Sequence, residues 1–177
     1  MSVICLVRHP AAFVMSLIKA EWPVEFDCLL AQPNLMEDYL HPFKHQMENP
    51  PDSFVERAAL LWTIIYYVLS MYIDRYEKWL VMRLEDIAYN PLMEFPNLFK
   101  FLDLPYSKRI ENIIKNYSDA DNPIEAKQGK TWEIKRNSIA SQSVWHKHLK
   151  SEEIKAIRNI TEPVSSRFYQ DFDWKIS

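Results

Sequence analysis

The stretch VICLVRHPAAFVMSLIKAEW, residues 3–22, contains both a strand and the helix that follows it. Residues 3–7 are all apolar and rich in β-branched side chains, which is typical of a strand. Pro10 suits the first position of a helix, and the apolar face of that helix consists of Phe13, Val14, Leu17 and Ile18. A strand that is apolar on both faces belongs inside a parallel sheet, so we expect other strands on both sides of it.

A second apolar run, WLVMR at residues 79–83, predicts another strand. Between the two runs, Ser53 to Lys78 has the pattern of one long helix, charged at both ends and apolar nearly all round in the middle. Such a helix is expected to be buried on several sides. A strand, a long crossover and another strand favour parallel pairing, so the predicted fold class is α/β.

Three further helices are expected after the second strand. Asn90 and Pro91 supply an N-cap and a first helical residue, Ser107 can cap the next helix, and Ser151 can begin the last one. Pro96 and Pro163 are expected to kink, divide or restart the helices that contain them.

Two segments lack this periodicity. Residues 21–50 contain four prolines among aromatic and acidic residues, which indicates an irregular excursion with a short helix near residues 35–40. Residues 118–143 are polar and are expected to form a loop. The loop is a candidate anion site because it contains several cations, namely Lys127, Lys130, Lys135 and Arg136.

Composition limits the class of ligand. The 177 residues have a formal net charge of -3, which does not suggest nucleic acid binding, so any bound anion must be held by a local cluster of cations. The single glycine, Gly129, excludes both glycine-rich phosphate-binding motifs, GxGxxG and GxxxxGK[ST], from this chain.

The sequence favours a cytoplasmic protein. Cys5 and Cys28 form no CxxC pair, and Arg8 interrupts the N-terminal apolar run before it reaches the length of a signal peptide. The longest uncharged segment, residues 58–73, has 16 residues, whereas a membrane span needs about 20. We therefore expect no transmembrane segment.

Arg8 and Ser16 are the first candidates for chemistry. Arg8 ends a buried strand, and in open α/β sheets ligands bind beyond the carboxyl ends of the strands. Its guanidinium can bind a phosphate through two hydrogen bonds, and the Ser16 hydroxyl can add a third. The alternative is a surface arginine paired with a carboxylate, and the spacing alone favours that alternative.

The other candidates carry less weight. His41 with His45, and His146 with His148, have no cysteine or paired carboxylate to complete a metal site, so no metal is assigned. His9 lies beside Arg8, where a turn or cap role is commoner than that of a base. The exposed-loop tryptophans Trp22 and Trp132 are candidates for stacking on a sugar.

Three blocks of the chain resemble the sulfotransferase superfamily, in the order that this family has them. Arg8-His9-Pro10 with Ser16 resembles its 3'-phosphate-binding motif, in which a serine follows the arginine by eight residues. RLEDIAYNPLMEFPNLFKFLDLP, residues 83–105, resembles its strand-then-helix block with an acidic pair. RNSIASQSVWHKHLKSEEIKAIRNITEPVSSRFYQDFDW, residues 136–174, is similar to the C-terminal segment of bacterial carbohydrate-type members.

The resemblance implies a P-loop-nucleotide-fold-like parallel sheet flanked by helices. It also implies a nucleotide donor, 3'-phosphoadenosine 5'-phosphosulfate, whose sulfonate passes to an acceptor hydroxyl, with a carbohydrate as the acceptor. Arg8 and Ser16 would hold the 3'-phosphate, with Arg136 and Ser138 as additional contacts from the C-terminal loop. Leu84 stands where some members have an aromatic residue near the adenine.

The family's glycine-rich donor loop lies upstream of the arginine strand, and this sequence has no counterpart of it. Residues 1–177 are therefore expected to be a single partial sulfotransferase domain, N-terminally truncated and inactive alone. Two alternatives remain open. One is a non-catalytic remnant that binds adenosine 3',5'-bisphosphate weakly, and the other is an interaction module that uses the long helix. The general base and the oligomeric state are not predicted.

Overall fold

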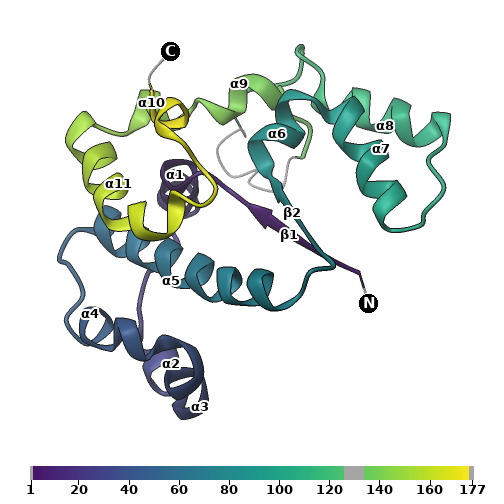
Figure 1. The fold of residues 1–177 in the computed structure, drawn as a ribbon. Coiled ribbons are helices and arrows are strands. Elements are labelled where there is room, and N and C mark those ends of the chain that lie inside the picture. Colours follow the sequence, from purple (N-terminus) through teal and green to yellow (C-terminus); the bar gives the residue numbers. More distant parts are fainter. Residues whose placement is uncertain (1, 126–133, 176–177) are drawn as a thin grey trace.

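The computed structural model describes residues 2–125 and 134–175. Within this part of the chain, two short strands lie at the centre, with helices grouped on either side of them (Figure 1). Strand β1, Val3–Val7, pairs with strand β2, Trp79–Arg83, in parallel. The register places Val3 opposite Trp79 and Val7 opposite Arg83. Both predicted strands, their bounds and their parallel pairing are confirmed.

The sheet is smaller than expected. Among the described residues it has only two strands, so β1 has a neighbour on one side rather than on both. One face carries Val7 and packs on aromatic side chains, whereas Leu6 on the opposite face is 52% exposed. The prediction that β1 is buried on both faces was wrong at Leu6, because hydrophobicity alone does not show whether a second layer covers the strand.

Three helices form the main core beside the sheet. Helix α1, Pro10–Ala20, and helix α11, Ser151–Ser165, both pack against the long helix α5, Phe54–Arg75. The predicted long helix at Ser53 to Lys78 is confirmed to within three residues. Its middle is buried on several sides, with Trp62 fully enclosed.

Helix α5 is also, among the residues described, a helix long and apolar enough to cross a membrane by length and composition. Within its apolar 18-residue window, 44% is buried inside the protein. The sequence analysis counted only the uncharged residues 58–73, whereas the helix also includes charged residues near both ends and is therefore longer. Its contacts with α1 and α11 are those expected of a core helix.

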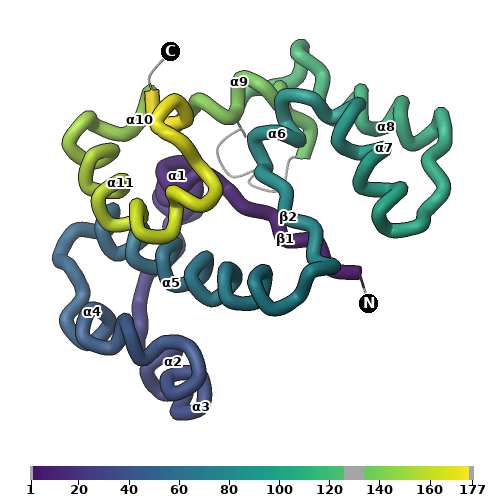
Figure 2. Tube along the Cα trace, viewed as in Figure 1, coloured from purple at the N-terminus to yellow at the C-terminus, as the bar shows by residue number. Residues whose placement is uncertain are grey.

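Most of the remaining helices form two outlying groups (Figure 1, Figure 2). The excursion after α1 contains five short segments: α2 Asp27–Leu30, α3 Pro33–Leu35, the π-helix η1 Met36–Leu40, the 3-10 helix η2 His41–Phe43 and α4 Lys44–Glu48. The second group follows β2 and contains α6 Leu84–Tyr89, α7 Pro91–Phe101, α8 Lys108–Ser118 and α9 Ser138–Gln142. Helix α10, Trp145–His148, and the 3-10 helix η3, Asp171–Trp174, flank α11 in the sequence.

The helix starts were predicted better than the proline effects. Helix α7 begins at Pro91, helix α11 begins at Ser151, and the Ser107 hydroxyl accepts a bond of 3.4 Å from the Ile110 N–H at the start of α8. Helices α7 and α11 run undivided through Pro96 and Pro163. A proline removes one backbone bond, and packing of the apolar helix face can offset that loss.

Candidate functional site

The backbone of Arg8 is fixed by the core helix α5. The Arg8 N–H donates to the Tyr66 hydroxyl at 3.2 Å, and the Arg8 carbonyl accepts from the Trp62 indole N–H at 2.9 Å. Tyr66 and Trp62 are one helical turn apart, so both reach the end of β1 from the same face of α5. These two bonds hold the backbone of Arg8 in place at the carboxyl end of β1.

The Arg8 side chain is a partly buried cation. Its Nε is inaccessible to solvent and has no hydrogen-bond partner among the described residues. Burial lowers the pKa of Arg8, and the negative charge of Glu85 opposes that effect. Arginine stays protonated at neutral pH in spite of such a shift, so Arg8 presents a positive charge whose hydrogen-bonding capacity is not used up.

Glu85 is the buried carboxylate behind Arg8, and sequence reasoning identified it only as part of an acidic pair. Its two oxygens accept 2.8 Å bonds from the His9 backbone N–H and from the Tyr169 hydroxyl. Burial raises the pKa of Tyr169, with the charge of Glu85 as the next cause, so the phenol remains a donor. Glu85 is thus held rigidly at a position from which its field favours the charged form of Arg8.

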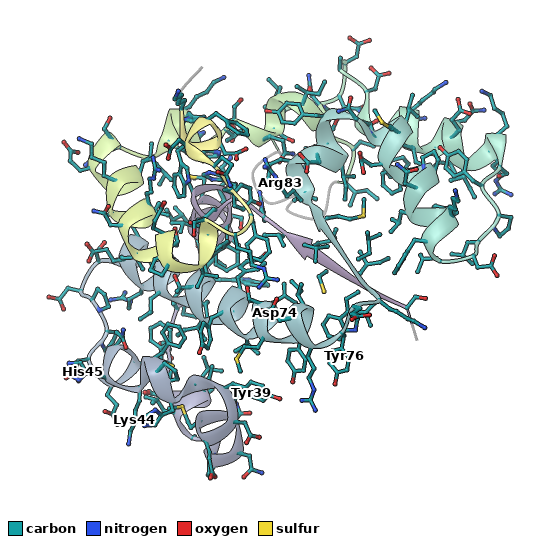
Figure 3. All side chains as sticks on the ribbon, in the orientation of Figure 1. Tyr39, Lys44, His45, Asp74, Tyr76 and Arg83 are labelled. Carbon is teal, nitrogen blue, oxygen red and sulfur yellow. The ribbon has the colours of Figure 1, made fainter. Side chains whose placement is uncertain are left out.

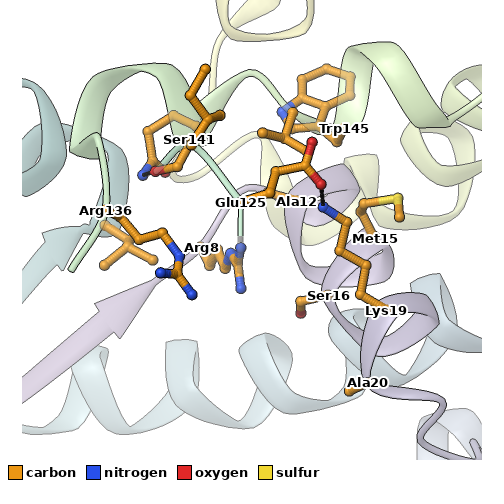
Figure 4. Close-up of a pocket in the computed structure, with 14 residues that line it drawn as sticks. Arg8, Ala12, Met15, Ser16, Lys19, Ala20, Glu125, Arg136, Ser141 and Trp145 are labelled. Atoms are coloured by element: carbon orange, nitrogen blue, oxygen red, sulfur yellow. Dashed lines mark hydrogen bonds and ion pairs between the residues drawn. The ribbon is translucent and has the colours of Figure 1, made fainter. Parts of the chain in front are cut away.

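A cavity of about 410 Å³ lies beside Arg8 (Figure 4). Ser16 and Arg136 line it together with Arg8, although these three residues come from the end of β1, from α1 and from the segment before α9. Figure 4 shows both guanidinium groups extending toward the same space. The structure therefore brings together three of the four residues that the sulfotransferase resemblance selected.

Ser16 and Arg136 each have a local contact. The Ser16 hydroxyl donates to the Phe13 carbonyl at 2.7 Å, which leaves its oxygen lone pairs able to accept. Arg136 donates to the Lys135 carbonyl at 2.7 Å, and its backbone N–H donates to the Tyr117 carbonyl at 3.1 Å. To donate to a phosphate, the Ser16 hydroxyl must rotate away from Phe13.

Ser138, the fourth residue, does not line this cavity. Its hydroxyl donates to the Ala88 carbonyl at 2.7 Å and lies 3.2 Å from the Ser118 carbonyl, so it connects α9 to α6 and α8. It contributes instead to an adjoining apolar cavity of about 490 Å³. The two cavities share four lining residues, namely Leu84, Arg136, Ser141 and Gln142.

Helix α9 itself lies within the segment that was predicted to be a loop. Asn137 caps it, with its side-chain oxygen accepting a 2.9 Å bond from the Ala140 N–H. A helix of five residues is too short to show periodicity in the sequence, and the capping asparagine was the available signal. The candidate residues Lys127, Lys130 and Trp132 lie outside the described residues.

Lys19 and Glu125 also line the main cavity, and the sequence did not single them out. They form an ion pair with each other, and the second oxygen of the Glu125 carboxylate lies 3.2 Å from Nε2 of His148. The Lys19 ammonium, followed by His148, holds the pKa of Glu125 below its usual range. Lys19 lies three residues after Ser16, a helical spacing that places both on one face of α1.

His9 occupies the N-cap position of α1, as predicted, but its side chain makes no capping hydrogen bond there. Its ring is 2% exposed and is stacked on Trp145 with a centroid distance of 4.8 Å. Burial lowers the pKa of His9 to about 3, and nearby His146 and Arg83 add to the effect. Within the part of the chain that the structure describes, its buried ring nitrogens have no hydrogen-bond partner, and it does not line the cavity, so His9 is not placed to act as a base there.

The described residues contain no candidate metal site. In residues 2–125 and 134–175, no three histidine, cysteine, aspartate or glutamate side chains are arranged to hold a metal ion. Comparison of the chain with protein-family models, curated proteins and solved structures finds no match. A function can therefore be inferred only from the geometry of the cavity and from the resemblance of its residues to the sulfotransferase motif.

Proposed function

We propose that the cavity at the end of β1 binds a phosphate monoester, and that this group is the 3'-phosphate of a sulfonate-donor nucleotide. The observation that carries the proposal is the convergence of Arg8, Ser16 and Arg136 on one cavity from three separate segments. Two guanidinium groups and a hydroxyl match the charge and hydrogen-bonding needs of a phosphate. Glu125 is a carboxylate in the same cavity, but it is already paired with Lys19.

The position of the cavity supports a nucleotide ligand. It lies beyond the carboxyl ends of parallel strands, where open α/β sheets bind their ligands. The adjoining apolar cavity shares Leu84 and Arg136 with it, so a base can occupy one cavity while its phosphate occupies the other. We accordingly propose that the parallel pair with its helices is the remnant of a P-loop-nucleotide-type sheet.

The proposed reaction is sulfonate transfer from 3'-phosphoadenosine 5'-phosphosulfate to a carbohydrate hydroxyl. The sulfur–oxygen bond to the 5'-phosphate breaks, a bond to the acceptor oxygen forms, and the acceptor proton passes to a base. The cavity lining described above includes no histidine, and its carboxylate is ion-paired. This favours a second candidate function, in which the chain binds adenosine 3',5'-bisphosphate without catalysing transfer.

Calorimetric titration tests the phosphate site. We expect saturable binding of adenosine 3',5'-bisphosphate, and binding at least about tenfold weaker for adenosine 5'-monophosphate, which lacks the 3'-phosphate. Arg8→Met removes the guanidinium while keeping an unbranched side chain, and should weaken binding of the bisphosphate by about tenfold or more.

Arg109→Met is the matched control, because Arg109 is an exposed arginine of α8 that does not line the cavity. The Arg109→Met variant should bind adenosine 3',5'-bisphosphate with the same affinity as the unmodified chain. Equal affinities for the two nucleotides, or an Arg8→Met variant that binds as well as the unmodified chain, would contradict the proposed site. A turnover assay with the donor and a carbohydrate acceptor then separates transfer from binding alone.

A further inference from the structure

The cavity contains a third cation that neither the sequence motif nor the proposed function uses. Helix α1 presents Ala12, Met15, Ser16, Lys19 and Ala20 to the cavity, a spacing that describes one continuous helix face. Lys19 lies one helical turn beyond Ser16 on that face. An ammonium in this position can reach a ligand that Ser16 contacts.

Lys19 is engaged by an internal anion. Figure 4 shows its ammonium meeting the Glu125 carboxylate within the cavity, and the other carboxylate oxygen lies 3.2 Å from His148 of α10. The two side chains of the ion pair are each slightly more than a third exposed, 38% and 39%, so the pair is accessible to solvent and to competing ions. Exposed pairs of this kind contribute little stability and exchange partners readily.

The charges around the cavity favour an added anion even with this pair in place. Of the described residues that line the cavity, Arg8, Arg136 and Lys19 are cations and Glu125 is an anion, and Glu85 adds a negative charge behind Arg8, so the described cations outnumber the carboxylates and favour an ionised phosphate monoester. The Glu125 carboxylate accepts from the Lys19 ammonium through one oxygen, as a phosphate oxygen can. The structure thus already shows an anion bound at one cation of the cavity.

We propose that Lys19 is a further phosphate-binding residue of this cavity and that Glu125 is its internal counter-ion, which the incoming anion must displace. The inference rests on the proposed function, because it requires an anion to enter the cavity that Arg8 lines. Glu125 then acts as a built-in competitor that sets the affinity of the site. His148 shares in holding it, since it contacts the same carboxylate.

The test is a double-mutant cycle with inorganic phosphate as the probe, read by calorimetry at constant ionic strength. Glu125→Gln keeps the shape of the side chain but removes the competing charge, and should tighten phosphate binding about fivefold. Lys19→Met should weaken it about fivefold. In the Lys19→Met background, adding Glu125→Gln should change affinity less than about twofold, because no ammonium remains to be released.

Glu111→Gln is the matched control. Glu111 accepts from two lysines of α8, Lys108 at 2.8 Å and Lys115 at 2.7 Å, but does not line the cavity. Its substitution removes the same charge from the molecule and should leave phosphate affinity unchanged. Thermal unfolding of every variant checks that the affinities refer to folded protein.

The outcomes separate this inference from the proposed function. If phosphate binding is lost in Arg8→Met while Glu125→Gln binds no tighter than the unmodified chain, the inference is overturned and the proposed function stands. An equal gain in phosphate affinity from Glu125→Gln with and without Lys19 also overturns it. The removed charge would then act on the phosphate through long-range electrostatics and not by releasing Lys19. If neither the unmodified chain nor Glu125→Gln binds phosphate, both proposals fail. Binding only after Glu125→Gln supports both.

Discussion

Two arginines stand side by side at the carboxyl ends of the two strands, and their surroundings differ sharply. Arg83, labelled in Figure 3, is the last residue of β2 and is opposite Val7 in the register, so Arg8 follows one residue beyond it on β1. Arg83 makes two bonds to Asp173, at 2.5 and 3.3 Å, and its guanidinium carbon lies 4.7 Å from the ring centre of Tyr169. Among the described residues, Arg8 has no ion pair of this kind.

The pKa shifts follow the same contrast. Burial alone would lower the pKa of Arg83, but the hydrogen bonds and charge of Asp173 raise it above its ordinary value. Burial dominates at Arg8 and lowers its pKa. Arg83 is therefore held by a carboxylate that the fold supplies, whereas no side-chain ion pair holds Arg8 within the described residues. A buried cluster of His9, Glu85 and Tyr169 lies near both arginines: Arg83 lies over the Tyr169 ring, and the charge of Glu85 acts on Arg8.

The largest expected effect is the loss of the Arg83 ion pair. Arg83→Met leaves the Asp173 carboxylate, whose side chain is 9% exposed, without its charged partner. Removing one member of a buried pair costs on the order of 3 kcal/mol of unfolding free energy. Urea denaturation of the variant and of the unmodified chain measures the difference.

Arg167→Met supplies the control for burial. Arg167 binds Asp74 through two bonds of similar geometry, at 2.9 and 2.6 Å, but the Asp74 side chain is 66% exposed. Because this pair is exposed to solvent, the expected loss of unfolding free energy is a small fraction of the loss at Arg83. Equal losses at Arg83 and Arg167 would mean that burial does not distinguish these pairs.

The second largest expected effect is a loss of stability at acidic pH, caused by the buried ring of His9. His9 has a pKa of about 3 in the folded chain and an ordinary value of 6.5, so the unfolded chain binds a proton on His9 throughout this interval and the folded chain does not. Its contribution is present above pH 6.5 and is lost as the pH falls toward 3. At pH 5 the loss should be about 2 kcal/mol.

Denaturation at pH 7 and pH 5 measures this dependence in three proteins. His9→Phe retains a ring for the contacts with Trp145 and removes the titrating group, so it should lose about 2 kcal/mol less than the unmodified chain between the two pH values. His45→Gln replaces an exposed ring and should follow the unmodified chain. If His9→Phe shows the same pH dependence as the unmodified chain, His9 is not the group responsible.

The sequence predicted the long periodic elements of this fold and the residues that begin or end them. Runs such as 3–7 and 53–78 have enough apolar positions to define a period, and Pro10 and Ser107 act through local geometry. Most of the short helices could not be predicted in this way, because one turn has no measurable period. The exception is the short helix expected near residues 35–40, which is confirmed by η1 at Met36–Leu40. The exposure of Leu6 depends on what covers the sheet, which the strand itself does not encode.

The candidate site divides in the same manner. The proximity of Arg8 and Ser16 was predictable because one strand-turn-helix unit carries both of them, but their spacing alone favoured a surface arginine paired with a carboxylate. Arg136 was selected by the resemblance, and it lines the same cavity as Arg8 and Ser16. Ser138 was selected by the same alignment, but its hydroxyl bonds to backbone carbonyls elsewhere. Glu85 and Glu125 meet the site only through tertiary contacts, so no spacing in the sequence identifies them.

The smallest expected effect is the one that tests the comparison most directly. Arg8→Met removes a partly buried guanidinium whose Nε has no hydrogen-bond partner among the described residues. Relief of its desolvation and loss of its attraction to Glu85 oppose each other, so the free energy of unfolding should change by less than about 0.5 kcal/mol. The same substitution at Arg83 is expected to cost several times more, as measured by the same urea titration. A loss near 3 kcal/mol at Arg8 would mean that Arg8 is a structural residue like Arg83. A residue whose role is to bind a ligand contributes to the affinity for that ligand and not to the stability of the protein alone.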